Sequence, residues 1–283
     1  MRAVALGGGH GTALTLQALL GVTADVTAIV SVADDGGSSG VLRSQLDLPA
    51  VGDIRKCLVA LADPSNEFRD HLEHRFRLGE LDNHALGNLL LASLTESTGS
   101  LEAAAAMVGK LVHARGRVLP TSNDSLTLRA QSDAGVREGQ VVISQTSGLR
   151  VLQVGPTDAR PCVSAIEALR EADLVVVGPG SLFTSVLAAL VSPGIREALA
   201  SRKGKFVFVA NLLSEEPESK GFSVAQQLVA LRDHRVEPDL VVAEQTVREE
   251  ALTCPVVWAD LVAEDRYQHD ATKLARVLAD LVA

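Results

Sequence analysis

The sequence lacks the features that mark secreted, membrane-spanning and nucleic-acid-binding proteins. Its three cysteines, Cys57, Cys162 and Cys254, are far apart and odd in number, so neither a disulfide framework nor a zinc spacing can be read from them. No apolar run approaches the roughly 20 residues that cross a bilayer. No cluster of Lys and Arg is present and the formal net charge is −9, which argues against a surface for nucleic acid. The first residues are those of a strand rather than a signal peptide, so we expect a cytoplasmic protein without a membrane or nucleic-acid partner.

Aromatic residues are also scarce, at 3% of a chain of 283 residues that is 47% apolar. The core must therefore be built from Val, Leu, Ala and Ile. This composition is typical of a parallel sheet that is covered by helices on both faces.

The order of the predicted elements supports the same architecture. A strand over residues 2–6, a glycine turn, a helix over 12–20 and a strand that ends near residue 32 form a βαβ unit. Four helical patterns then make a long helical excursion, and residues 117–155 alternate like a small antiparallel β insertion. The βα rhythm resumes after the insertion. We therefore predict an α/β fold, a doubly wound and mostly parallel sheet, as a single domain over residues 1–283.

The first glycine turn, Gly7–Gly11, lies between a strand and a helix. Glycines let the backbone approach a ligand, and the helix N-terminus offers free N–H groups to a phosphate. The spacing is neither the dinucleotide fingerprint nor a P-loop. A tight turn between packed elements is the alternative, and the position after the first strand favours the nucleotide interpretation.

Two aspartates occupy the turn after the second predicted strand. Asp34 and Asp35 follow Gly11 by about the spacing at which a Rossmann-type fold places an acidic residue on the ribose. Adjacent carboxylates are also suited to Mg²⁺ or another divalent cation that bridges a diphosphate. The alternative for either residue is a cap on the next helix.

A second glycine turn, Gly178–Ser181, follows another apolar strand and repeats the logic of the first. Both turns would fall on the same edge of a parallel sheet. His84 and Asn88 at a helix start, Asp53 at another, and Asn211 at a strand end are weaker candidates, because caps and strand ends explain them equally well.

No nucleophile and base can be assembled from the sequence. Ser38 and Ser39 approach His10 only if the fold brings them together, and no Gly-x-Ser-x-Gly motif is present. The sequence therefore favours binding over catalysis.

Five motifs, in order along nearly the whole chain, strongly resemble the YvcK-like gluconeogenesis factors, which share a superfamily with the CofD 2-phospho-L-lactate transferases. They are Gly7–Gly11, Val32–Gly40, Gly52–Leu61, His84–Leu90 and Gly178–Ser185. The Val32–Gly40 run is specific to the YvcK side. One departure is Gln268, which stands where the family usually has an arginine.

The resemblance implies a Rossmann-like fold and a cytoplasmic protein that binds UDP-sugars such as UDP-N-acetylglucosamine, with a role in cell shape and cell-wall precursor supply during gluconeogenic growth. Asp34 and Asp35 are the residues that it offers to a divalent metal. The ligand-binding candidates are Gly8, Gly9, His10, Gly11, Asp34, Asp35, Gly37, Ser38, Ser39, Asp53, His84, Asn88, Gly178, Gly180, Ser181 and Asn211.

Two rival hypotheses remain open at this stage. One is a CofD-like, metal-dependent transferase, for which one Trp and one Tyr offer little stacking surface to a flavin-type acceptor. The other is a scaffold that binds a protein partner through its acidic surface. The sequence leaves a homo-oligomer open as well.

Overall fold

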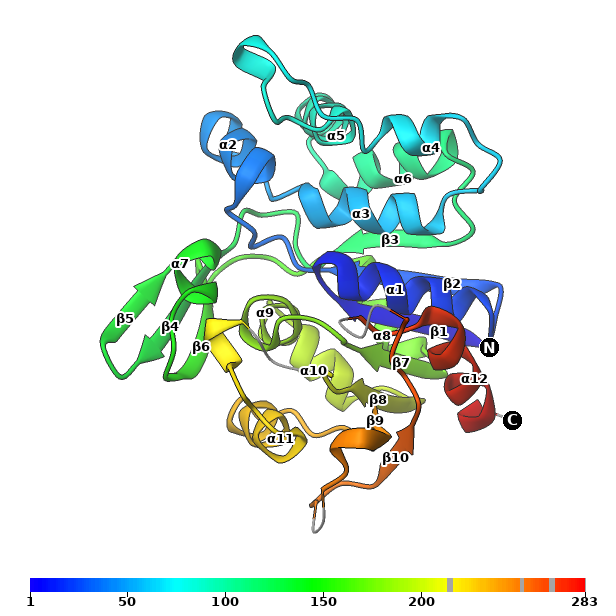
Figure 1. The fold of residues 1–283 in the computed structure, drawn as a ribbon. Coiled ribbons are helices and arrows are strands. Elements are labelled where there is room, and N and C mark those ends of the chain that lie inside the picture. The colour runs from blue at the N-terminus through cyan, green and yellow to red at the C-terminus, as the bar shows by residue number, and fades with distance from the viewer. Residues whose placement is uncertain (213–215, 250–251, 265–267, 283) are drawn as a thin grey trace.

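A computed structural model describes residues 1–212, 216–249, 252–264 and 268–282, and its centre is a seven-stranded parallel sheet (Figure 1). The strands follow the order β10-β9-β8-β7-β1-β2-β3. Their bounds are Arg2–Gly7 (β1), Asp25–Val30 (β2), Arg117–Pro120 (β3), Leu174–Val177 (β7), Lys205–Val209 (β8), Leu240–Glu244 (β9) and Val256–Ala259 (β10). The predicted α/β class and parallel sheet are confirmed.

Helices flank this sheet in two contacting groups. Helices α1, α3 and α12 pack together, and α8, α9 and α10 form the second group. The α-helices have the bounds Gly9–Leu20 (α1), Gly37–Leu46 (α2), Gly52–Leu61 (α3), Phe68–His71 (α4), Leu86–Thr98 (α5), Leu101–Leu111 (α6), Gln140–Ser144 (α7), Val163–Glu171 (α8), Ala188–Leu190 (α9), Ile195–Ala200 (α10), Val224–Asp233 (α11) and Ala271–Val282 (α12). Among the helices within the described ranges, none is both long and apolar enough to cross a bilayer.

The sheet is doubly wound about β1. The chain first moves from β1 to β2 and β3 on one side, and later from β7 to β8, β9 and β10 on the other. The connections that leave the carboxyl ends of β1 and β7 therefore lead to strands on opposite sides of this pair. The point between β1 and β7 is the topological switch point, where open α/β sheets bind their ligands.

The inserted β segment is shorter than the predicted 117–155. Residues Arg117–Pro120 pair with β2 at the edge of the main sheet, because their apolar side chains are buried there. The small antiparallel sheet has the order β5-β4-β6 and consists of Thr127–Ser132 (β4), Gly135–Glu138 (β5) and Leu149–Gly155 (β6). Between β5 and β6, inside the segment predicted as β, Gln140–Ser144 forms the helix α7.

Local boundaries also differ from the predictions at three points. The helix α1 begins at Gly9, inside the first glycine turn. Asp53 is not the N-cap of α3, because Val51 holds that position and Asp53 lies in the first turn. The second of the four predicted helical patterns, over residues 67–76, forms a helix only at Phe68–His71. Arg75, near the end of this pattern, pairs with Ala85 instead.

The start of α1 lies directly against the turn after β7. A Cβ atom built on Gly11 would collide with the carbonyl oxygen of Pro179. Across the same junction, the Thr15 hydroxyl donates to the carbonyl of Gly178 at 2.6 Å. Only glycine permits this approach of two backbones.

We expect Gly11→Ala to lower the free energy of unfolding by about 2 kcal/mol, because the added methyl group forces the two turns apart. Denaturant unfolding measures the effect. Gly109→Ala in α6 is the matched control, since its Cβ would meet Leu58 at 3.5 Å, an ordinary contact, and alanine is the better helix former. Equal stability of Gly11→Ala and the wild-type protein would contradict the close approach.

Candidate functional site

A cavity of about 280 Å³ opens at the switch point between β1 and β7. Residues from both glycine turns line it, together with side chains from α3, α7 and the turn after β2. The lining comprises Gly8, Gly9, His10, Gly11, Ser31, Asp34, Asp53, Lys56, Gln140, Gly180, Ser181, Thr184 and Ser185. Eight of the residues predicted from the sequence therefore meet in one place.

The first turn presents the N-terminus of α1 to this cavity. Gly8 is the N-cap and has no side chain to bond the first-turn amides, so these N–H groups lack an intrahelical acceptor. The hydroxyl of Thr12 turns back to the Gly8 carbonyl at 3.1 Å. The resulting helix start is open to an anion and carries the positive end of a twelve-residue helix dipole.

The second turn is held by Asn211, which follows β8. Its amide group accepts from the Gly180 N–H at 3.0 Å and donates to the Gly180 carbonyl at 2.8 Å. Gln227 on α11 in turn accepts from the Asn211 N–H at 3.0 Å. Asn211 thus fixes the backbone of the turn rather than only ending its strand.

A buried carboxylate lies behind the second turn. Glu218 accepts from the Phe183 N–H at 3.0 Å and from the Thr184 hydroxyl at 2.8 Å, at the start of the π-helical turn Leu182–Leu187. Burial raises the pKa of the Glu218 carboxyl. Sequence reasoning missed Glu218 and Gln227, because the groups that they bind lie about 35 and 16 residues away in the chain.

A second cavity of about 310 Å³ shares His10, Gly11, Gly180 and Ser181 with the first, so the two form one groove. Its other lining residues include Leu14, Asn211, Leu212, Gln268 and His269. Burial lowers the pKa of His269 to about 4, so its imidazole is neutral at physiological pH and bonds the Ala210 carbonyl. Gln268, which stands where the resembled family usually has an arginine, therefore lines this groove.

Asp34 brings negative charge into the first cavity, beside Asp53. Burial, followed by the charge of Asp53, raises the pKa of Asp34 to about 6. One oxygen of Asp34 accepts from the Gly36 N–H at 3.0 Å. Lys56 pairs with Asp53 at 2.8 Å and is the cation of the cavity; the sequence predictions did not include it.

The two adjacent aspartates have different surroundings. Asp35 accepts from the N–H groups of Gln140 and Val141, at 2.9 Å each, and so caps α7. This contact fastens the turn after β2 to the inserted β segment and places Gln140 at the cavity. Asp34 lines the first cavity and accepts a backbone hydrogen bond through one carboxylate oxygen. It is therefore the better placed of the two aspartates to contact a ligand.

The metal expectation can be compared with the donors that are present. Within the residues that the structure describes, no three His, Cys, Asp or Glu side chains cluster as they would in a complete metal site. Asp34 and Asp53 line one cavity, and a pair of carboxylates suits a Mg²⁺ ion that takes its remaining ligands from phosphate and water. The donor set therefore fits a metal that arrives with a diphosphate.

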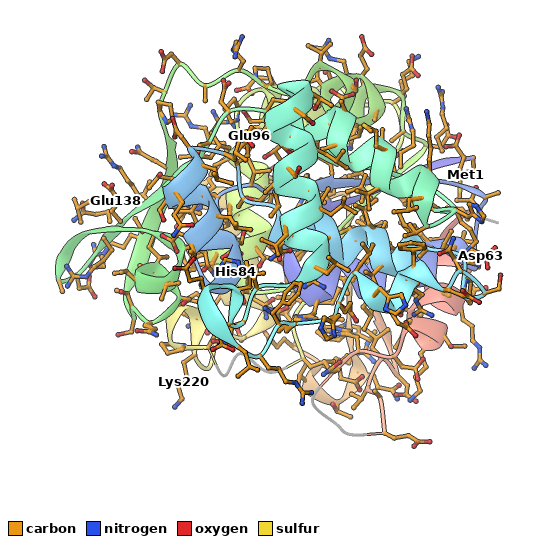
Figure 2. The ribbon with its side chains drawn as sticks, turned by 90° about the horizontal axis from the view of Figure 1, so that it is seen from above. Met1, Asp63, His84, Glu96, Glu138 and Lys220 are labelled. Atoms are coloured by element: carbon orange, nitrogen blue, oxygen red, sulfur yellow. The ribbon has the colours of Figure 1, made fainter. Side chains whose placement is uncertain are left out.

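Ser38, His84 and Asn88 lie apart from the groove. The Ser38 hydroxyl is 3.1 Å from His84 Nδ1 and accepts from the Asn88 amide at 3.0 Å. The Asn88 amide oxygen in turn accepts from Arg55 Nε at 3.1 Å. Figure 2 shows His84 between α2 and the start of α5. Ser38 thus meets His84, not His10, and the sequence could not reveal this pairing because 46 residues separate the two.

A third cavity of about 910 Å³ adjoins this cluster, with Asp35, Gly37, Ser38 and His84 in its lining. Ser39 points elsewhere and accepts from the N–H groups of Val51 and Gly52 at 3.1 and 3.2 Å, which holds the start of α3. The predicted residues therefore divide between the groove, this cavity and structural contacts.

Comparison with known proteins identifies the family of this chain. The family described as 2-phospho-L-lactate transferase CofD matches residues 3–282. Proteins named gluconeogenesis factor from Bacillus subtilis and Halalkalibacterium halodurans are 36% and 40% identical, over 98% and 82% of this chain and 96% and 73% of their own. A crystal structure of a UPF0052 family member from Bacillus halodurans superimposes with a TM-score of 0.92 at 33% identity and covers 98% of both chains. The chain belongs to the CofD/YvcK family, together with the proteins named gluconeogenesis factor.

Proposed function

We propose that the groove between the two glycine turns binds a UDP-sugar, of the UDP-N-acetylglucosamine type, and that the protein acts as a gluconeogenesis factor. The observation that carries this proposal is the convergence of both turns at the switch point of the sheet. The diphosphate would lie between the start of α1 and the turn Gly178–Ser181. The choice of uridine rests on the resemblance of the motifs.

The groove has the chemistry that such a ligand needs. Open amides at the start of α1 and the ammonium group of Lys56 suit phosphate oxygens. The second cavity adds the apolar side chains of Leu14 and Leu212 beside the polar groups of Asn211 and His269. The charged diphosphate of a UDP-sugar would meet the amides and Lys56 in the first cavity, and a ring at one end of the ligand would meet the apolar side chains of the second.

The cellular role that we propose is regulatory. The relatives named gluconeogenesis factor support a role in gluconeogenic growth. The cytoplasmic location and the link from UDP-sugar level to cell shape and cell-wall precursor supply rest on the resemblance of the motifs. A homo-oligomer or a protein partner would transmit the signal.

A second candidate function is a CofD-like, metal-dependent transfer of 2-phospho-L-lactate. The matched family description and the two carboxylates in the cavity favour it. Asp34 and Asp53 would hold the cation, which would neutralise charge on the transferred phosphate. Turnover with a divalent metal, a nucleotide-activated phospholactate and a flavin alcohol, lost in Asp34→Asn, would establish this activity over the regulatory one.

We expect calorimetry to detect binding of UDP-N-acetylglucosamine or UDP-glucose, with weaker binding of UMP, which lacks the diphosphate, and of GDP, which carries another base. Lys56→Met should weaken the UDP-sugar about tenfold, because it removes the cation from the cavity. Lys110→Met, at an exposed position in the last turn of α6, is the matched control and should leave binding unchanged. Absence of binding of every UDP-sugar at millimolar concentration would refute the proposal.

Asp34→Asn should stabilise the protein above pH 6 by about 3 kcal/mol, measured by denaturant unfolding. The folded-state pKa of about 6 is above the ordinary value of 3.8, so the unfolded chain releases this proton first as the pH rises. The penalty is absent below pH 4 and complete above pH 6. Asp47→Asn, at an exposed position, serves as the control. A gain that is equal at pH 4 and pH 8 would contradict the assigned pKa.

Binding of the UDP-sugar should also depend on the charge of Asp34. Without metal, affinity should fall as the pH rises from 5 to about 7, because the ionised carboxylate repels the diphosphate. With Mg²⁺ the trend should reverse, since the cation requires the carboxylate. Asp34→Asn should flatten both profiles in calorimetric titrations, and profiles identical to those of the wild-type protein would show that Asp34 does not face the ligand.

A further inference from the structure

Four arginines surround a cavity of about 400 Å³ that is remote from the groove: Arg196, Arg202, Arg232 and Arg235. They come from α10, from the end of α11 and from the segments that lead into β8 and β9. These segments enter the amino ends of their strands, whereas the groove lies at the carboxyl ends. The arginine cavity is therefore at the opposite edge of the sheet.

The charges in this cavity do not balance. Arg202 pairs with Asp239 at 2.6 Å, and Arg196 reaches only the exposed Glu197 at 3.3 Å. Among the residues that the structure describes, neither Arg232 nor Arg235 has an ion pair. Glu237 is the one carboxylate in the lining. This excess of positive charge stands out in a chain with a net charge of −9.

Arg235 is also held in an unusual backbone conformation. Its φ of 60° lies in the left-handed region, at the position after the C-cap His234 where helices usually place glycine. The N–H groups of Arg235 and Val236 close the helix end on the carbonyls of Arg232 and Leu231. A non-glycine residue is disfavoured in this conformation, and these two hydrogen bonds hold Arg235 in it.

Helix dipoles do not account for the whole cluster. The carboxyl ends of α10 and α11 each carry about half a negative charge, which one nearby cation satisfies. Four guanidinium groups exceed that need. Phe206, which stacks under Arg202 at 5.3 Å, and Val236 provide an apolar floor between them.

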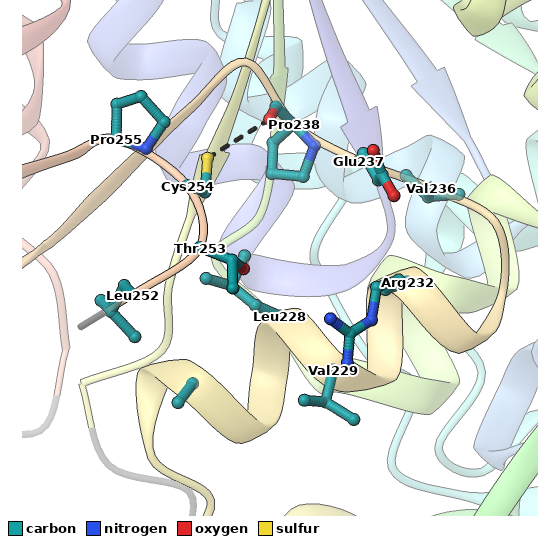
Figure 3. Close-up of a pocket in the computed structure, with 11 residues that line it drawn as sticks. Leu228, Val229, Arg232, Val236, Glu237, Pro238, Leu252, Thr253, Cys254 and Pro255 are labelled. Carbon is teal, nitrogen blue, oxygen red and sulfur yellow. Dashed lines mark hydrogen bonds between the residues drawn. The ribbon is translucent and has the colours of Figure 1, made fainter.

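Arg232 and Glu237 also line a neighbouring cavity of about 370 Å³. Figure 3 shows Arg232 on the last turn of α11 and Glu237 on the segment that follows, with the side chains of Leu228 and Val229 nearby. The arginine cavity thus continues into a mostly apolar hollow between α11 and the segment before β10.

We propose that this arginine cavity is a second anion site, which binds a small metabolite that carries a diphosphate or two phosphates. Guanidinium groups bind phosphate oxygens in a bidentate fashion. Arg232 and Arg235 would hold one phosphate and Arg196 would contact the second, while Arg202 stays paired with Asp239. The apolar floor and the adjoining hollow would take the uncharged part of the same ligand. This site does not depend on the nucleotide groove.

Arginine modification by phenylglyoxal, followed by peptide mass spectrometry, tests the site in the intact protein. Inorganic pyrophosphate at ten times its dissociation constant should slow modification of Arg232 and Arg235 about tenfold. Arg276, exposed on α12 and outside the cavity, should react at an unchanged rate in the same sample. Equal rates for all three arginines with and without millimolar pyrophosphate would overturn the proposal.

Calorimetry with two variants separates this site from the groove. The double variant Arg232→Ser, Arg235→Ser should weaken pyrophosphate at this site at least about tenfold, and both positions are exposed, so its melting temperature verifies the fold. Lys56→Met should keep the protection of Arg232. If Lys56→Met abolished the protection of Arg232 and Arg235 by pyrophosphate, the anion would be assigned to the groove and the second site refuted.

Discussion

The close approach of α1 to the turn after β7 is the constraint on which the groove depends. Gly11 has no Cβ, so the Pro179 carbonyl lies where a side chain would otherwise be. The two backbones can therefore share one cavity, and the Thr15 hydroxyl joins them. Because β1 and β7 are neighbours from opposite halves of a doubly wound sheet, this junction is also the switch point.

Charge determines what the groove can accept. The open start of α1 attracts an anion, while Asp34 and Asp53 repel one. Burial, followed by the charge of Asp53, raises the pKa of Asp34. A proton on Asp34 or a divalent cation resolves the conflict. The charge on this pair of carboxylates therefore decides whether the groove favours an anion alone or an anion accompanied by a cation.

The sequence predicted the parallel sheet, both glycine turns and eight residues of the first cavity, because strand periodicity and turn glycines are local signals. It failed where a partner distant in the chain decides the outcome. Asp35 is satisfied by two amides about 105 residues away, and Ser38 by His84. The apolar run at Gln140–Ser144 is a helix capped by that same aspartate, and no local pattern reports such a cap.

The contact between Asp35 and α7 gives the inserted β segment a part in the groove. Since α7 is fixed by the turn that also carries Asp34, Gln140 borders the first cavity although it belongs to the insertion. The seven-stranded sheet does not need these residues for its own pairing. Changes within β4, β5 and β6 can therefore shift Gln140 and one wall of the groove while both glycine turns stay in place.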